Sequence, residues 1–321
     1  MMENLYYNLP REKIAQKPSI PRDECNLLVL RKDKIEHRKF YEIADYLEKG
    51  DVLILNDTKV IKTRVFGIKD TGGKLDILVI GGKDGIYECL IKGKYREGTV
   101  FFLGGKRGEI IEKRNGRCKI KISLSMEEIK SIGRMPVPPY IKGEVEDDWY
   151  QTVFANKEGS IAAPTAGLHF TEKLIEKIRG KGVKIVFVTL HVGLATFLSP
   201  EKIRGEKEYY IVNEETANAI NNSSGKIIGV GTTVVKAIES SSKDGITYPS
   251  QGWSDLFISP GYKFQSKLNG LLTNFHMPSS SPLMLTVSFG GIERVMKAYK
   301  EALKKNYKFL SFGDAMLILN V

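Results

Sequence analysis

The stretch KIIGVGTTVVKAIESS, residues 226–241, decides the fold class. Residues 226–230 form an apolar run suited to a buried strand, and the turn Gly231-Thr232-Thr233 leads into helical apolar spacing over 234–241. A strand, a glycine turn and a helix in succession are typical of α/β proteins. The turn lacks the last glycine of the G-x-G-x-x-G fingerprint, since Val234 stands there. A dinucleotide-binding dehydrogenase or a Rossmann methyltransferase therefore has little support.

Similar alternation of strands and helices flanks this stretch on both sides. Thr171 is suited to cap a helix, and Gly180 to end it. The expected strands are 51–55, 183–190, 226–230 and 312–319, and the expected helices are 41–49, 171–179, 234–241 and 291–306.

A glycine-rich segment interrupts the α/β pattern. Twelve of the 31 glycines lie from Gly67 to Gly116, and they separate short β-type runs. Such spacing is typical of an antiparallel meander or a small barrel. We predict an α/β (mixed α+β) main domain formed by residues 1–61 and 150–321, with an inserted all-β, barrel-like domain at 62–149. The expected strands of the insert are 75–80, 87–91, 99–103, 109–111 and 118–122.

The composition is that of a globular protein. The 321 residues suggest about two domains, and 42% hydrophobic with 27% charged residues is close to the average for such proteins. No stretch approaches the ~18 apolar residues that span a bilayer. The three cysteines form no C-x-x-C pair, which favours reduced thiols. We expect a cytoplasmic protein without membrane association.

The net charge of +11 favours a polyanionic partner such as nucleic acid. The positive charge is spread along the whole chain, so it fits a merely soluble basic protein equally well.

Three of the four histidines share one sequence context. His169, His191 and His276 each stand beside glycine or proline at the end of an apolar run. In α/β folds such loops at strand ends carry catalytic groups, and histidine exchanges protons near neutral pH. Each histidine taken alone fits a buried ring bonded to backbone carbonyls better than a catalytic one. Three in the same context indicate a shared site.

Other sites have weaker sequence support. A zinc site with three histidines lacks any close histidine pair, so no metal is expected, and a Ser-His-Asp hydrolase lacks the G-x-S-x-G turn. Among the carboxylates Asp76, Glu239 and Asp314, Glu239 is the best candidate because it follows the threonine turn on a helix. Asn56, Thr58 and Lys59 follow the strand 51–55 and project from its carboxyl end.

Several strings together resemble the S-adenosylmethionine:tRNA ribosyltransferase-isomerase family. They occur in the family's order along the whole chain, and the most specific are APTAGLHF at 163–170, TLHVG at 189–193 and TNFH at 273–276. GDVLILNDTKV at 50–60, GRMPVPPYI at 133–141 and FGDAM at 312–316 add to them. The chain departs from the family pattern at Asn26, Lys59, Asp76 and Pro282.

This resemblance implies that S-adenosylmethionine donates its ribosyl group, with rearrangement, to 7-aminomethyl-7-deazaguanine at the wobble position of tRNA. The product is epoxyqueuosine in tRNA, and adenine and methionine are released. S-adenosylmethionine is then a co-substrate, with no prosthetic group and no metal. The implied catalytic residues are His169, His191 and His276; the implied substrate-binding residues are Asn56, Thr58, Thr165, Thr232, Thr233, Glu239 and Asn274.

A wobble base lies in a single-stranded loop, where proteins stack bases on aromatic rings and hold phosphates with Lys and Arg. We therefore expect the protein to bind the anticodon arm of tRNA. We also expect a monomer. Two other classes remain open: an RNA-binding protein without catalysis, and a methyltransferase that releases S-adenosylhomocysteine.

Overall fold

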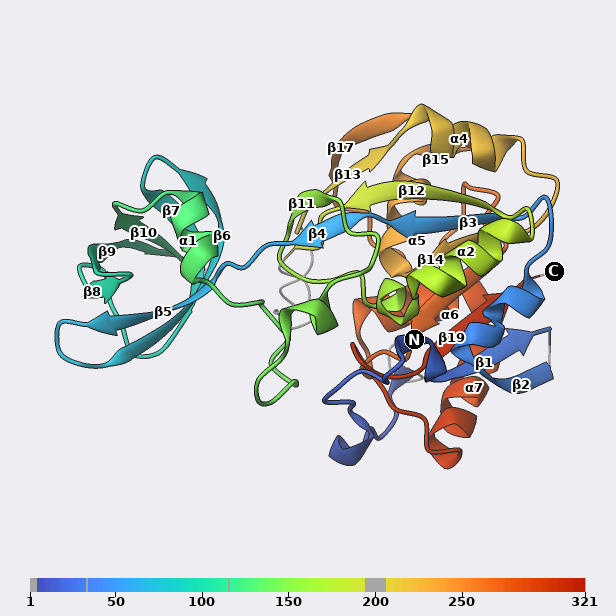
Figure 1. Cartoon of the computed structure of the whole chain (residues 1–321), viewed down its shortest axis with the longest axis horizontal. Helices are drawn as coiled ribbons and strands as arrows, with labels where there is room; N and C mark the ends of the chain where they lie inside the picture. Colours follow the sequence, from blue (N-terminus) through green and yellow to red (C-terminus); the bar gives the residue numbers. More distant parts are fainter. Residues whose placement is uncertain (1–4, 33, 115, 194–205, 321) are drawn as a thin grey trace. The chain divides into compact units, whose positions relative to one another are not determined.

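The computed structural model describes residues 5–32, 34–114, 116–193 and 206–320, and the chain forms two compact units (Figure 1). The larger unit comprises Met1–Lys59 and Pro139–Val321, and the smaller one comprises Val60–Pro138. The expected class, a mixed α/β main body with an inserted β-barrel, is confirmed. Residues 139–149, which the sequence places with the insert, belong to the larger unit, and residues 60–61, which it places with the main domain, belong to the smaller one.

The larger unit is built on a nine-stranded mixed sheet. Strands β12, β3, β14 and β18 are neighbours and run parallel, so their carboxyl ends meet at one edge of the sheet. The order across the sheet is β17 (Ser250–Ser254), β13 (Glu208–Val212), β12 (Lys184–Leu190), β3 (Val52–Asn56), β14 (Ile227–Val230), β18 (Gly270–Asn274), β19 (Ala315–Leu319), β1 (Asn26–Arg31) and β2 (Lys34–Lys39).

Helices cover both faces of this sheet. The α-helices are α2 (Glu172–Gly180), α4 (Glu214–Asn221), α5 (Thr232–Ser240), α6 (Ser281–Gly290) and α7 (Ile292–Lys304). The 3-10 helices are η2 (Arg11–Lys13), η3 (Arg22–Glu24), η4 (Phe40–Tyr46), η5 (Asp147–Tyr150) and η6 (Thr165–His169). Short strands outside the sheet are β4 (Thr58–Val60), β11 (Lys157–Ser160), β15 (Ser242–Lys243) and β16 (Ile246–Thr247).

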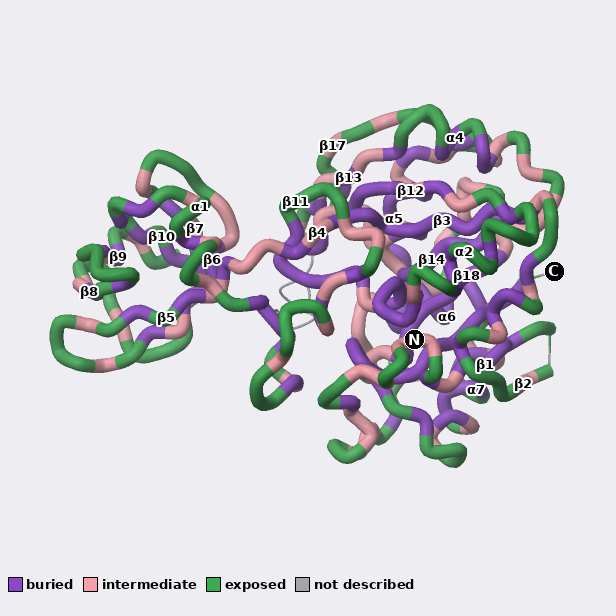
Figure 2. Tube along the Cα trace, in the orientation of Figure 1, coloured by how far each residue is buried: buried purple, intermediate pink, exposed green. Residues whose placement is uncertain are grey.

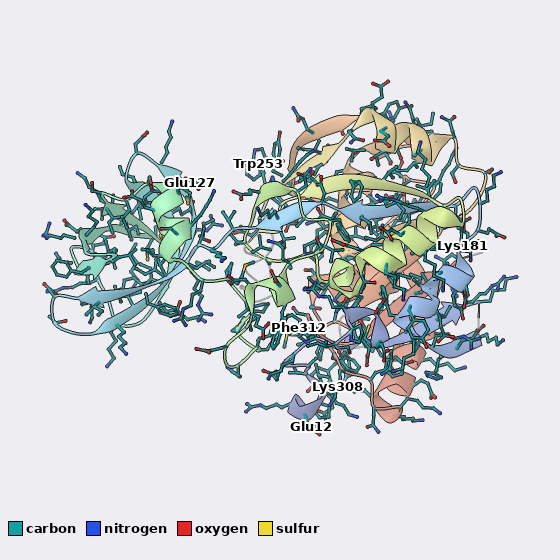
Figure 3. The ribbon with its side chains drawn as sticks, viewed as in Figure 1. Glu12, Glu127, Lys181, Trp253, Lys308 and Phe312 are labelled. Carbon is teal, nitrogen blue, oxygen red and sulfur yellow. The ribbon has the colours of Figure 1, made fainter. Side chains whose placement is uncertain are left out.

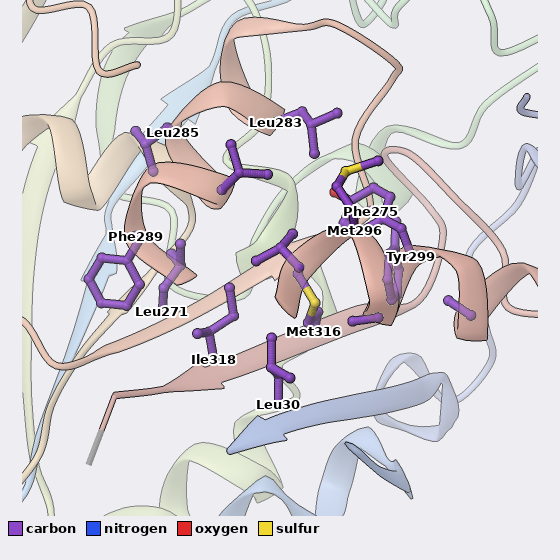
Figure 4. Packing of buried hydrophobic residues seen from close by; sticks show 14 of the residues in the cluster. Leu30, Leu271, Phe275, Leu283, Leu285, Phe289, Met296, Tyr299, Met316 and Ile318 are labelled. Carbon is purple, nitrogen blue, oxygen red and sulfur yellow. The ribbon is translucent and has the colours of Figure 1, made fainter. Parts of the chain in front are cut away.

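The two faces bury alternate residues of each strand, as the strand period of two requires. In β1, Leu28 and Leu30 pack with α6 and α7, whereas Leu27 and Val29 pack with η4 and α2. Figure 4 shows Leu30 and Ile318 of the sheet in one apolar cluster with residues of α6 such as Leu285 and Phe289. Strands β3 and β14 are buried along their whole length (Figure 2), which is typical of parallel strands covered on both faces.

The helix expected at 171–179 is confirmed, and the one expected at 41–49 differs in type. The Oγ1 of Thr171 accepts a hydrogen bond from the Leu174 N–H at 3.2 Å, so Thr171 caps α2 as predicted. Residues 40–46 form the 3-10 helix η4 instead of an α-helix. Its buried residues Phe40 and Ile43 are three apart, and a 3-10 helix places residues at that spacing on one face.

The smaller unit is a closed six-stranded barrel, as the glycine turns predict. One strand, β5, is not among the predicted ones, because its apolar Phe66 and Ile68 point outward and hide the alternation. The order is β10 (Arg117–Ile122), β7 (Ile86–Lys92), β6 (Lys74–Lys83), β5 (Arg64–Lys69), β8 (Val100–Leu103) and β9 (Lys106–Arg114), with α1 (Met126–Ile132) following.

Cys25, Cys89 and Cys118 are buried and free. Within the described ranges, no helix combines the length and the apolar character that crossing a bilayer requires.

A buried carboxylate joins the starts of β3 and β14. Asp51 is fully buried, and its Oδ1 accepts a hydrogen bond from the Lys226 N–H at 2.7 Å. Its Oδ2 accepts from the Glu48 N–H at 3.0 Å and lies 3.0 Å from the Lys226 ammonium. Charge-assisted bonds of this kind are among the stronger ones in proteins.

We expect Asp51→Ala to lower the free energy of unfolding by about 3 kcal/mol, because two backbone N–H groups lose their acceptor and Lys226 keeps only its pairing with Glu48. Urea denaturation measures the change. Asp45→Ala, the same substitution at an exposed carboxylate of η4, is the control and is expected to stay within about 0.5 kcal/mol of the unaltered chain. Equal effects of the two substitutions would contradict the role given to Asp51.

Candidate active site at the carboxyl ends of the parallel strands

A cavity of about 530 Å³ opens in the larger unit where β14 and β18 end and α5 begins. Ligands of open α/β sheets bind outside the carboxyl ends of the strands, and this cavity lies there. We call its lining residues the wall. Five of the predicted site residues belong to the wall: Thr165, Thr232, Thr233, Asn274 and His276.

The glycine turn shapes the wall at the start of α5. Gly231 has a φ of +93°, a conformation that favours glycine, and its N–H donates to the Leu272 carbonyl at 2.7 Å. No side chain caps the helix, and the first N–H groups of a helix have no acceptor within it. Together with the hydroxyls of Thr232 and Thr233, this end of α5 suits an anionic or hydroxyl-bearing ligand.

Asn56 lies behind the wall and joins three elements. Its Nδ2 donates to the Leu190 carbonyl at 3.0 Å and to the Thr233 Oγ1 at 3.3 Å. Its Oδ1 accepts from the N–H groups of Leu190 and Thr58, each at 3.1 Å. Asn56 is 1% exposed and does not line the cavity. Through its bond to the Thr233 hydroxyl, it orients a residue that does line the cavity.

His169 also lies behind the wall, against Asn274. Its Nε2 is 3.2 Å from the Asn274 Oδ1, and its Nδ1 is 3.2 Å from the Cys25 Sγ. The Asn274 Nδ2 donates to the Leu310 carbonyl at 2.8 Å, which leaves the Oδ1 as the acceptor for the imidazole. His169 therefore carries its proton on Nε2, and its Nδ1 accepts a hydrogen bond from the Cys25 thiol.

His276 is the histidine of the wall. Its Nε2 is 2.8 Å from the Thr273 Oγ1, and its backbone N–H donates to the Tyr299 hydroxyl at 2.9 Å. Burial lowers the pKa of His276 to about 3 and that of His169 to about 4. Both imidazoles are therefore neutral at pH 7.

His191 follows β12 at the same edge of the sheet, bonded to Thr58. Its Nδ1 is 2.8 Å from the Thr58 Oγ1, and burial lowers its pKa. Neither residue lines the cavity, although Val192 next to His191 does. The structure thus places His191 and His276 just after strands, and His169, at the end of η6, against the last residue of β18; one of the three lies on the wall.

Of the three carboxylates singled out in the sequence, Glu239 and Asp314 hold backbone in place, and Asp76 pairs with a side chain. Glu239 is buried, and it accepts hydrogen bonds from the Tyr262 hydroxyl at 3.0 Å and from the Gln265 N–H at 2.7 Å. It is not part of the wall. Asp314 accepts from the Asn26 N–H, and Asp76 pairs with Arg64 on the barrel, where the two make a bidentate contact.

Sequence reasoning missed Glu208 and its pairing with Lys236 on the wall. The Lys236 ammonium lies 2.5 Å from the Glu208 Oε2, and the Gly193 N–H donates to the Oε1 at 3.0 Å. Lys236 follows Thr232 by four residues and Thr233 by three. On a helix this spacing places the lysine beside both threonines, so the sequence carries a signal for its position in the site. Glu208 begins β13 with no local motif, so only the paired strands reveal it.

In the part of the chain that the structure describes, no group of three histidine, cysteine or acidic side chains is arranged to hold a metal ion. The wall instead offers hydroxyls, an amide, one imidazole and an ion pair. These groups suit a polar organic ligand that carries both charge and hydroxyls.

Comparisons with known proteins agree along the whole chain. Residues 2–318 match the family model described as queuosine biosynthesis protein. The S-adenosylmethionine:tRNA ribosyltransferase-isomerase of Caldanaerobacter subterraneus is 45% identical, with 98% of each chain covered. The protein of that name from Acetivibrio thermocellus is 43% identical, with 99% of each covered.

A solved structure is similar as well. The crystal structure of S-adenosylmethionine tRNA ribosyltransferase from Thermotoga maritima superimposes with a TM-score of 0.59 at 36% identity, covering 98% of this chain and 100% of that one. Identity at this level over whole chains shows common descent, not fold alone. The chain therefore belongs to the S-adenosylmethionine:tRNA ribosyltransferase-isomerase family, enzymes of queuosine biosynthesis.

Proposed function

We propose that this protein transfers and isomerises the ribosyl group of S-adenosylmethionine onto 7-aminomethyl-7-deazaguanine at the wobble position of tRNA. The products are epoxyqueuosine in tRNA, adenine and methionine. Its relatives carry the name of this activity at 43% to 45% identity. The observation that carries the proposal is the cavity at the strand ends, whose wall combines threonine hydroxyls, Asn274, His276 and the Lys236–Glu208 pair.

The reaction needs three proton transfers. A base removes a proton from the carbon next to the sulfonium, an acid protonates the departing adenine, and a base keeps the attacking amine neutral. We assign His276 as the proton acceptor on the basis of its position, because it is the histidine of the wall and its ring is unprotonated at pH 7. His191 stays a second candidate acid or base at the neighbouring strand end.

Substrate binding falls to the polar groups of the wall. Thr165, Thr232 and Thr233 offer hydroxyls to the ribose or the adenine, and Asn274 offers its amide. Lys236 is suited to the carboxylate of the methionine moiety, as a point charge whose position Glu208 sets. His169 acts through Asn274, whose side chain it orients.

We propose further that the protein works in the cytoplasm and binds the anticodon arm of tRNA as a monomer. The net charge of +11 supports the RNA partner.

The activity is tested by mixing the purified protein with S-adenosylmethionine and tRNA that carries the aminomethyl base, then separating the products by chromatography. Release of adenine and methionine that depends on the modified tRNA is the expected result. S-adenosylhomocysteine as the product would make the protein a methyltransferase, and salt-sensitive tRNA binding without turnover would make it a binding protein.

We expect His276→Gln to lower the rate of adenine release by at least roughly 100-fold, because the proton acceptor of the wall is lost. Binding of S-adenosylmethionine, measured by calorimetry, is expected to change by less than about three-fold. His37→Gln, at an exposed histidine on β2, is the control and keeps the full rate. An undiminished rate in His276→Gln would remove this residue from the mechanism.

We expect stability to fall as the pH falls through the range where unfolded histidine gains its proton. The pKa of His169 is about 4 in the folded protein and about 6.5 unfolded, so the unfolded state binds more protons below about pH 6.5. This residue alone then removes about 2 kcal/mol between pH 7.5 and pH 5. In His169→Gln, urea denaturation should show a correspondingly flatter pH dependence; an unchanged slope would argue against a buried neutral imidazole.

A further inference from the structure

Three aromatic side chains form a row across the strands at one end of the large sheet. His191 and Tyr209 are nearly parallel, with ring centroids 6.3 Å apart and an interplanar angle of 16°. Tyr209 and Trp253 meet edge to face, with centroids 5.4 Å apart at 66°. The row follows from strand pairing, because Tyr209 of β13 stands opposite Trp253 of β17 and the His191 N–H donates to the Tyr209 carbonyl.

The outer end of the row is open to solvent. Trp253 is 68% exposed on β17, the last strand of the sheet, and Figure 3 labels it at the rim of the larger unit. Tyr209 is half-buried between the other two rings. An indole that projects from an edge strand leaves a ring face available for stacking.

The inner end of the row is held rigidly. The Thr58 Oγ1 bonds the Nδ1 of His191 at 2.8 Å, and Gly159 lies against the other side of the ring. A Cβ at Gly159 would come within 2.9 Å of the imidazole, and the φ of this glycine is +146°, so a larger residue does not fit there. A ring fixed from two sides loses little entropy when it contacts a ligand.

Basic side chains stand beside the row. Two charges act on His191, since Asp57 raises its pKa and Lys157 on β11 lowers it, and exposed Lys207 directly precedes the strand residues Glu208 and Tyr209. Lys59 directly follows Thr58, and its ammonium lies 3.2 Å from the Glu158 Oε1. Aromatic faces beside ammonium groups are the features that single-stranded nucleic acids require, for bases and phosphates respectively.

The row also adjoins the cavity along the chain. His191 is followed by Val192, and Tyr209 is preceded by Glu208, and both of these neighbours belong to the wall. Because side chains alternate along a strand, Tyr209 and Glu208 point to opposite faces of β13. The row therefore lies on the face of the sheet opposite to Glu208, and an RNA loop must cross the strand ends to place one base in the cavity and others on the row.

We propose that His191, Tyr209 and Trp253 form a stacking surface for unpaired bases of the RNA substrate, next to the base that enters the cavity. The inference rests on the proposed function, since it names a contact of the same RNA. A protein partner is disfavoured because the row is narrow and is flanked by lysines.

The two tryptophans of the chain allow a direct test. In Trp149→Phe, Trp253 is the only indole, and we expect its fluorescence to be quenched on titration with an unmodified RNA hairpin of the anticodon arm. In Trp253→Phe, Trp149 remains and its emission is expected to stay constant. Binding of the hairpin, seen by anisotropy of a dye on the RNA, without quenching of Trp253 would overturn the proposal.

Kinetics provide the second test. We expect Trp253→Ala to raise the KM for modified tRNA and the Kd for the hairpin roughly ten-fold, with kcat and the KM for S-adenosylmethionine unchanged. Trp253→Phe should restore most of the affinity. Tyr41→Ala is the matched control, an aromatic 42% exposed on η4, which packs with β1 and β2 at the other end of the sheet.

These experiments distinguish failure of the stacking surface from failure of the proposed activity. If the unaltered protein releases adenine but Trp253→Ala keeps its KM for tRNA, the stacking surface is refuted and the activity stands. If Trp253→Ala changes the oligomeric state on sedimentation and leaves RNA binding intact, the row is an interface between two copies and the proposal is wrong. Absence of adenine release by the unaltered protein, with quenching of Trp253 intact, would refute the activity alone.

Discussion

The larger unit depends on the parallel pairing of β3 with β12 on one side and with β14 on the other. β3 is buried along its whole length, so both of its ends must satisfy their polar groups inside the protein. Asp51 does this at the start by accepting from Lys226, and Asn56 does it at the end by bonding Leu190 and Thr233. These two side chains set the register in which the neighbouring strands end.

The alignment of the strand ends brings the residues of the candidate site together. Because the parallel strands end at one edge, the glycine turn, the histidine loops and the amide of Asn274 converge from segments far apart in the chain. The three histidines nonetheless lie in different surroundings. His276 faces the cavity. His169 lies behind Asn274 and contacts the Cys25 thiol. His191 packs between Gly159 and Tyr209. In our proposals His276 transfers a proton, His169 positions a neighbour, and His191 packs in the ring row while it stays a second candidate acid or base.

Much of the fold is predictable because its causes are local. The Thr171 cap, the glycine turn at Gly231 and the glycine-separated strands of the barrel act within a few residues, so their patterns show in the sequence. The predicted secondary structure was wrong where a different backbone geometry produces the same hydrophobic pattern. Apolar residues three apart serve a 3-10 helix at η4 as well as an α-helix, and outward-facing Phe66 and Ile68 hide β5.

The sequence by itself determined the fold class, the family and the residue types gathered at the strand ends, because strand patterning and family motifs are properties of short segments. Only the tertiary structure decided which of these residues meet the cavity. Glu208 and Lys236 become a pair, and Tyr209 and Trp253 a row, because β13 and β17 join the sheet beside β12. Strand pairing of this kind depends on contacts across the whole sheet, and no single segment carries a signal for it.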